Sequence, residues 1–299
     1  MQPSFFKSSH KKKHPHSHST IPHSGNPRFL SVLTATAVVI ILFLFYSRRT
    51  LVSNNPCSDD TPPLTAAQAI IAAEFDTLAT PLVAILHYAT AREVPQQSKG
   101  EIRLTFEVLQ SLAPCNFLVF GIGHDSLMWD SFNPHGTTLF LEEDPKWTFS
   151  ALKRFPILRA HTVLYPTRLS DANSLLSSYK KDCRDGILKG NRQCHLALSE
   201  LPDEVYGRDW DVIMIDAPRG YFAAAPGRMA VIYSAAVMAR GRKRSGVTHV
   251  FLHDVDREIE RKYAKEFLCM KYRVGGIKRL WHFVIPPAVN VNDTTHGFC

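Results

Sequence analysis

Short apolar runs alternate with longer amphipathic stretches from Asn116 onward. Each run is rich in Val, Ile, Leu and Phe without polar alternation, which predicts a strand buried on both faces. Most stretches between the runs repeat apolar residues at helical spacing. We therefore expect an α/β domain with a mostly parallel sheet and helices on both of its faces. The expected strands are 116–120, 137–141, 161–165, 210–215, 249–252 and 279–285, and the expected helices are 145–155, 169–181, 227–240 and 256–270.

Two capping-box patterns mark helices that precede this alternation. The pattern at Thr65 opens an apolar, Ala-rich stretch, which predicts one or two helices broken near Pro81. The pattern from Ser98 to Glu101 begins a second amphipathic stretch, and Pro114 ends it. The α/β domain is therefore expected to carry extra helices before its first strand.

The apolar run from Phe29 to Tyr46 differs from the others because it is long and uncharged. At the rise of an α-helix it spans roughly 27 Å, which suits a thin bilayer. Arg48 and Arg49 stand where a signal peptide would have small residues, so a membrane anchor over 29–47 is favoured over a cleaved signal. Its modest length fits the membranes of the early secretory pathway.

The flanking charges predict how this anchor is oriented. Five Lys and Arg precede the run and two follow it, which places a basic, His-rich tail (1–28) in the cytosol. We then expect a stem (48–63), a lumenal domain (64–290) and a short tail (291–299). A glycosylation sequon at Asn292 agrees with a lumenal position.

The net charge of +8 gives no support to a nucleic-acid partner. Seven Lys and Arg lie before residue 50, where no Asp or Glu occurs, so the remaining chain is close to neutral. A neutral domain has no general attraction to polyphosphate. The basic character therefore belongs to the tail and the anchor.

The six cysteines form no CxxC pair, which argues against a zinc site. Cys183 and Cys194 bracket a polar loop. In an oxidising compartment they are candidates for a disulfide, and in a reducing one they would be two thiols.

Polar residues follow four of the predicted strands, at the edge of the sheet where open α/β folds bind ligands. Gly121 and Gly123 follow the first strand and allow the backbone to turn tightly beside a ligand, although they could serve the turn alone. Glu142 lies 21 residues after Gly121, close to the spacing at which a carboxylate binds a ribose diol. A nucleoside-containing ligand is therefore expected here.

Asp125 favours S-adenosylmethionine (SAM) over a dinucleotide as that ligand. A pyrophosphate beside its carboxylate would be repelled, and Ser126 replaces the third Gly of the dinucleotide fingerprint. SAM has a ribose, no phosphate and a cationic sulfonium, so Asp125 suits it. The expected cofactor residues are Gly121, Gly123, Asp125 and Glu142.

Asp216, His253 and Asp254 follow the fourth and fifth strands and are the candidate catalytic residues. A sugar hydroxyl is a weak acid, so methyl transfer to it calls for a base, a metal ion or both. His253 is the natural base, and Asp216 and Asp254 are candidate ligands of a divalent cation. The alternatives are that His253 bonds a backbone carbonyl and that Asp254 caps a helix.

The segment after Asp216 also offers residues for the acceptor. Arginine pairs bidentately with carboxylates, which would suit an acidic sugar. Arg228 is the preferred residue, since the run from Arg240 to Arg244 is more typical of a solvated loop. Tyr221 is expected to contact the acceptor with it.

Several long motifs resemble the plant polysaccharide-biosynthesis family of glucuronoxylan 4-O-methyltransferases and irregular-xylem proteins of the "fifteen" type. The resemblance covers roughly residues 65–290. The motifs are PCNFLVFGIGHDSLMW (114–129), TTLFLEEDP (137–145), WDVIMIDAPRGY (210–221), APGRM (225–229), AVMAR (236–240), THVFLHDVDREIE (248–260) and RLWHF (279–283).

The resemblance implies a Rossmann-like SAM methyltransferase fold in a Golgi type II membrane protein. The expected activity is methyl transfer to glucuronic acid side chains of xylan in secondary walls. The alternative is a non-catalytic protein that supports other xylan-synthesis proteins. The stretches ALSELPDEVYGRDWD (197–211) and RLWHF resemble the irregular-xylem branch more closely.

Overall fold

The computed structural model describes residues 80–183, 186–288 and 298–299. The predicted cytosolic tail, membrane anchor and stem lie outside these residues, as does the sequon at Asn292. Within the described ranges, no helix is both long enough and apolar enough to cross a membrane.

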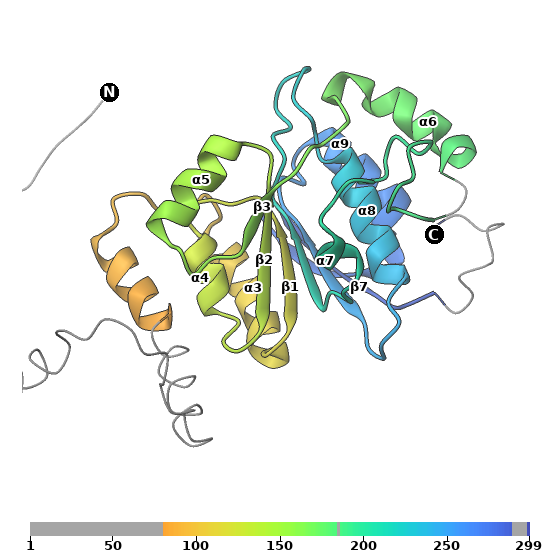
Figure 1. Cartoon of the computed structure of the whole chain (residues 1–299). Coiled ribbons are helices and arrows are strands. Elements are labelled where there is room, and N and C mark those ends of the chain that lie inside the picture. Colours follow the sequence, from red (N-terminus) through yellow and green to blue (C-terminus); the bar gives the residue numbers. More distant parts are fainter. Residues whose placement is uncertain (1–79, 184–185, 289–297) are drawn as a thin grey trace, which may run out of the picture. The chain divides into compact units, whose positions relative to one another are not determined.

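The described residues form one mixed sheet of seven strands (Figure 1). These are β1 (Asn116–Phe120), β2 (Thr137–Glu142), β3 (Ala160–Thr162), β4 (Val212–Ile215), β5 (Thr248–Leu252), β6 (Arg273–Ile277) and β7 (Leu280–Ile285). Their order is β3-β2-β1-β4-β5-β7-β6. β7 runs antiparallel to both of its neighbours, and the pairings from β3 to β5 are all parallel.

Helices cover both faces of the sheet, as the sequence predicts (Figure 1). A helix over residues 80–90 precedes the labelled elements. The labelled helices are α3 (Lys99–Leu112), α4 (Ser126–Ser131), α5 (Pro145–Arg154), α6 (Ala172–Asp182), α7 (Asp203–Tyr206), α8 (Met229–Arg240) and α9 (Glu258–Tyr263). Short helical turns lie at Leu169–Asp171, Ala264–Leu268 and Met270–Tyr272.

Alternate side chains of each central strand enter different cores. Phe117 and Val119 of β1 pack with residues of α3 and α4, whereas Leu118 and Phe120 pack with residues of α6 and α8. This alternation explains why the strands read as continuous apolar runs, since successive side chains point to opposite, equally covered faces.

The main element that the sequence analysis missed is β6. Its residues are mostly exposed and include Gly275 and Gly276, so it has neither the apolar run nor the alternation of a buried strand. It lies at the edge of the sheet and pairs only with β7. Edge strands depend on pairing rather than burial, which removes the signal used elsewhere.

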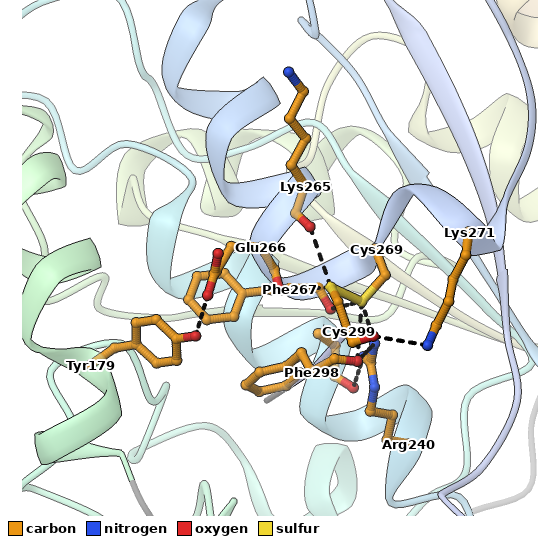
Figure 2. The surroundings of a disulfide bond; sticks show 10 residues. Tyr179, Arg240, Lys265, Glu266, Phe267, Cys269, Lys271, Phe298 and Cys299 are labelled. Atoms are coloured by element: carbon orange, nitrogen blue, oxygen red, sulfur yellow. Dashed lines mark hydrogen bonds between the residues drawn. A yellow bond between two sulfur atoms is a disulfide. The ribbon is translucent and has the colours of Figure 1, made fainter. Parts of the chain in front are cut away.

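Two disulfides tie loops to the α6, α8 and α9 side of the domain. Cys183–Cys194 confirms the predicted pair. Cys269–Cys299 was not predicted, and it closes a 30-residue separation. Figure 2 shows that Phe298, next to Cys299, lies against Phe267 and Arg240. These aromatic and cation–π contacts hold the bonded end of the chain on the core.

Candidate active site

The turn after β1 is tied to the end of β2. Gly121 has a φ of 116°, a conformation that favours glycine. A Cβ there would lie 3.0 Å from the Cβ of Ala217. The amide of Ile122 donates to Glu142 Oε2 at 3.1 Å. Gly121 therefore lets the turn after β1 pass close to the segment after β4. Glu142 holds the same turn from β2 through the amide of Ile122.

Glu142 is held in place from two sides. Its Oε1 accepts from the amide of Asp144 at 3.0 Å, and its Oε2 accepts from Ile122. Burial raises the pKa of this carboxyl above its usual value, although these hydrogen bonds oppose the shift. Asp144 caps α5 by accepting from the amides of Lys146 and Trp147. Each Glu142 oxygen keeps a second lone pair for a ligand.

Asp125 lies at the start of α4 and brings negative charge to the same turn. Its Oδ2 accepts from the indole of Trp129 at 2.9 Å. Burial, followed by the nearby charge of Asp216, raises the pKa of Asp125 to about 6. A pyrophosphate at the start of α4 would meet the carboxylate of Asp125.

These turns surround a pocket of about 510 Å³ at the carboxyl ends of β1, β2, β4 and β5. That volume is typical of sites for small molecules and cofactors. Most of the predicted site residues line it. They are Gly121, Gly123, Asp125, Glu142, Asp216, Tyr221, Arg228 and Asp254.

Asp216 is the central carboxylate of the pocket. Its Oδ1 accepts from His253 Nδ1 at 2.8 Å, and its Oδ2 accepts from Gln97 Nε2 at 3.0 Å. Burial raises the pKa of this carboxyl, but the His253 hydrogen bond and the charge of Arg228 outweigh burial and lower it overall. Asp216 is therefore an ionised acceptor that faces the pocket, with 28% of its side chain exposed.

His253 lies behind Asp216 rather than in the pocket. It is 2% exposed, and its Nε2 lies 3.7 Å from Glu101 Oε1. A base must come within hydrogen-bond reach of the proton that it removes. The buried position of His253 does not favour its predicted role as the base in contact with the acceptor, and His253 is placed to orient the carboxylate of Asp216.

The contacts of Arg228 do not favour its predicted role in binding the acceptor. It is 3% exposed, and its guanidinium donates to the carbonyls of Pro218, His253 and Asp216. It also pairs with Asp254 at 2.8 Å. With these donors occupied, Arg228 holds the two strand-end segments together and is not placed to bind a substrate carboxylate.

Asp254 is surrounded by arginines. Arg228, Arg257 and Arg279 lie 2.8, 2.9 and 2.7 Å from its oxygens. Asp216, His253 and Asp254 still offer ligand atoms within 4.8 Å of one another. A divalent cation there would have to displace at least one guanidinium, because like charges cannot share the same oxygens at low cost. These residues fit an ion-paired cluster better than a metal centre.

Sequence reasoning missed several residues of the site. Gln97 and Glu101 lie at the start of α3, where the capping box was recognised only as a helix signal. Trp147 and Arg257 line the pocket from α5 and from the residue before α9. Nothing in their local pattern marks them, since they reach the pocket through the packing of the helices on the sheet.

The pocket fits SAM. A ribose can bind Glu142, and the carboxylates of Asp125 and Asp216 give the negative surroundings that a sulfonium cation requires. The close approach allowed at Gly121 leaves room for the ligand along the turn. When bound, SAM supplies an electrophilic methyl group.

The strand order and this pocket define a SAM-dependent methyltransferase domain of the Rossmann-like kind. A family model described as IRX15/IRX15L/GXM matches residues 100–283. The chain belongs to this family, as the sequence motifs indicated.

Relatives from Arabidopsis thaliana correct the expected branch. Arabinogalactan O-methyltransferase 1 is 56% identical over 243 residues, covering 78% of this chain and 84% of the relative. Glucuronoxylan 4-O-methyltransferase 1 is 42% identical over 266 residues, covering 89% of this chain and 94% of the relative. Protein IRREGULAR XYLEM 15 is 34% identical over 278 residues, covering 86% of this chain and 84% of the relative. The placement nearer the irregular-xylem branch was therefore wrong.

Solved structures show a weaker likeness. A TehB-like SAM-dependent methyltransferase from Corynebacterium glutamicum aligns with a TM-score of 0.37 and 13% identity, over 72% of this chain and 99% of that one.

Proposed function

We propose that this protein transfers a methyl group from SAM to a hydroxyl of an acidic sugar on a plant polysaccharide. The observation that carries the proposal is the carboxylate of Asp216, which lines the pocket and accepts a hydrogen bond from His253 Nδ1 at 2.8 Å. Relatives named as arabinogalactan and glucuronoxylan O-methyltransferases support a polysaccharide acceptor.

Asp216 orients the acceptor in this mechanism. Its carboxylate accepts a hydrogen bond from the acceptor hydroxyl, orients the hydroxyl oxygen and takes its proton. SAM, held at Glu142, would supply the methyl group, whose bond to sulfur would break as its bond to the hydroxyl oxygen forms. His253 and Gln97 fix the carboxylate on its two oxygens. Positioning of this kind accounts for much of the rate gain in an in-line displacement.

Arg219, rather than Arg228, is placed to meet an acidic sugar. It lines the pocket, its side chain is 54% exposed, and it pairs with Glu143 through Nε at 2.6 Å. Its two Nη groups can meet a carboxylate of glucuronic acid. This arrangement favours an acidic sugar over a neutral one.

Between the two polysaccharide classes, arabinogalactan is favoured as the acceptor and glucuronoxylan is the second candidate. The identity of 56% to the arabinogalactan enzyme exceeds the 42% to the glucuronoxylan enzyme. A role in secondary-wall xylan would follow only from the second candidate.

The test of the activity is transfer of labelled methyl from SAM to each polysaccharide by the purified protein. We expect Asp216→Asn to lower kcat at least a hundredfold while the Kd for SAM stays within threefold, since general-base catalysis contributes about 10²–10⁴-fold. Glu107→Gln, on the outer face of α3 and paired with Arg103, is the matched control and should behave as wild type.

Two results would contradict the proposal. Absence of SAM binding at millimolar concentration would favour a non-catalytic partner of polysaccharide synthesis. Methyl transfer that survives Asp216→Asn would remove the central role of that carboxylate. A parallel assay with a chelator tests the predicted metal, and the arginines around Asp254 lead us to expect unchanged activity.

The proposed location is the Golgi membrane, with a type II anchor at 29–47 and the domain in the lumen. Two disulfides support this location, because such bonds persist in the secretory pathway and are rare in the cytosol. Protease treatment of intact Golgi vesicles should leave the domain whole and remove an N-terminal tag. Cleavage of the domain in intact vesicles would reject this orientation.

A further inference from the structure

The segment between β4 and α8 forms part of the pocket mouth and is held in a defined shape. The carbonyls of Ala223 and Ala225 accept from the amides of Ser170 and Leu169 at 3.0 and 2.8 Å. Within the segment, the amide of Gly227 donates to the carbonyl of Arg219 at 2.9 Å. The side chains at its tip are therefore presented by an anchored backbone.

Two aromatic side chains project from this tip. Tyr221 lines the pocket and is 67% exposed, and its neighbour Phe222 is 45% exposed. Their ring centroids lie 5.1 Å apart at an interplanar angle of 69°. Edge-to-face packing fixes each ring against the other and leaves broad apolar surface in water. We name Tyr221 and Phe222 the aromatic ledge.

The position of the ledge indicates what covers it. Exposed apolar surface beside a polar pocket marks a ligand-binding groove. The same segment supplies Arg219, which suits an acidic sugar, and the ring faces suit the C–H faces of pyranose units. Tyr221 both lines the pocket and is largely exposed, so a polysaccharide that extends out of the pocket beside Tyr221 reaches the ledge.

We propose that the aromatic ledge is a second acceptor subsite, which binds sugar units next to the one that receives the methyl group. The inference rests on the proposed function and goes beyond it, because it makes the length of the sugar chain a determinant of the acceptor's affinity. An acceptor long enough to cover both the pocket and the ledge binds more tightly than one that fills the pocket alone.

The experiment measures the binding of two glucuronic acid-capped oligosaccharides, one of two sugars and one of eight, to the full chain by calorimetry. We expect the longer one to bind about tenfold more tightly, which corresponds to about 1.4 kcal/mol. Tyr221→Ala and Phe222→Ala should each reduce this preference severalfold, and Tyr221→Phe should keep it, since the ring face remains.

Phe149→Ala is the matched control, because Phe149 is 68% exposed on α5 and does not line the pocket. It should keep the full preference for the longer oligosaccharide. Equal affinity for both lengths in the wild type, or an unchanged preference in both alanine variants, would overturn the proposal. So would a loss of self-association in these variants with unchanged affinity, which would make the ledge a contact between copies of the chain.

Binding is measured without SAM, so the outcome does not depend on methyl transfer. If the longer oligosaccharide binds through the ledge and no methyl group is transferred, the subsite stands and the proposed reaction fails. If transfer occurs with no preference for length, the reaction stands and the subsite fails.

Discussion

Single residues set the charge of the pocket lining. Asp125 and Asp216 bring two carboxylates close to the glycine turn. The arginines of the lining are paired, since Arg219 contacts Glu143 and Arg257 contacts Asp254. The carboxylates beside the turn therefore suit a cationic methyl donor.

Asp125 makes SAM binding depend on pH. Its pKa of about 6 means that acid removes a negative charge from the donor end of the pocket, while the lowered pKa keeps Asp216 ionised. We expect the Kd for SAM to rise about tenfold between pH 7.5 and pH 5, or about 1.4 kcal/mol. Fluorescence titration at several pH values measures it.

Asp125→Asn should show a flatter pH dependence and weaker binding at pH 7.5. S-adenosylhomocysteine, which has no sulfonium charge, provides a ligand control and should respond less to pH. An equal response of the two ligands would show that Asp125 does not sense the charge of the donor.

The same residue should reduce stability at neutral pH. A carboxyl whose folded pKa is raised favours folding below its unfolded pKa, and this contribution is lost as the pH rises through about 6. Asp125→Asn should therefore raise the unfolding free energy by roughly 3 kcal/mol at pH 7.5. The gain should vanish near pH 4, and urea denaturation at both pH values tests this.

At the residue scale, the sequence could predict which side chains gather at the pocket but not the contacts that set their roles. Strand ends indicated Glu142 and Asp216 because parallel strands bring their carboxyl ends to one edge. Burial of His253 and Arg228 depends on how helices and loops cover that edge. Gln97 contacts Asp216 and Glu101 lies beside His253. Both residues lie at the start of α3, and the pattern of strands gives no information about that helix.

At the scale of elements, the turn from β1 into α4 depends on one backbone conformation. Gly121→Ala introduces a side chain at a positive φ and 3.0 Å from Ala217. We expect a loss of about 1–3 kcal/mol of unfolding free energy from backbone strain, together with weaker SAM binding.

Gly275→Ala in β6 is the control, because a Cβ there meets nothing within 4 Å and its φ is not positive. It should keep both stability and SAM affinity. Wild-type stability in Gly121→Ala would show that the turn adapts, and that its glycine is not required by the backbone.

The elements themselves were largely predictable because burial on both faces leaves a strong pattern. β1 matches its predicted range, and β2, β4, β5 and β7 differ from theirs by one or two residues at an end. β3 is shorter than expected, at three residues, and runs only beside β2. Edge positions lose the apolar signal, which is also why β6 was missed.

At the scale of the whole molecule, the two disulfides should carry much of the stability of the domain. Loop closure predicts about 3.5 kcal/mol for Cys269–Cys299 and about 3 kcal/mol for Cys183–Cys194. Replacing the first pair by serine should lower the urea midpoint more than replacing the second. Reductant should destabilise the wild type and leave the variant without both pairs unchanged.

A response to reductant in the variant without both pairs would contradict this account, because the one other cysteine of the described ranges, Cys115, is a buried free thiol. A larger loss from the Cys183–Cys194 pair would show that packing around the bond outweighs loop length. Because Phe298 contacts Phe267 and Arg240, we expect the larger loss of stability from replacing the Cys269–Cys299 pair.

The contact between Gln97 and Asp216 sets a practical limit on how the protein can be shortened. A fragment trimmed to the family match, residues 100–283, would begin after Gln97 and end before Cys299. It would keep every strand except the last residues of β7, yet lose a donor to the central carboxylate and one half of a cross-link. Such a fragment could fail an activity assay that the full chain passes, so the boundaries for expression should lie outside both residues.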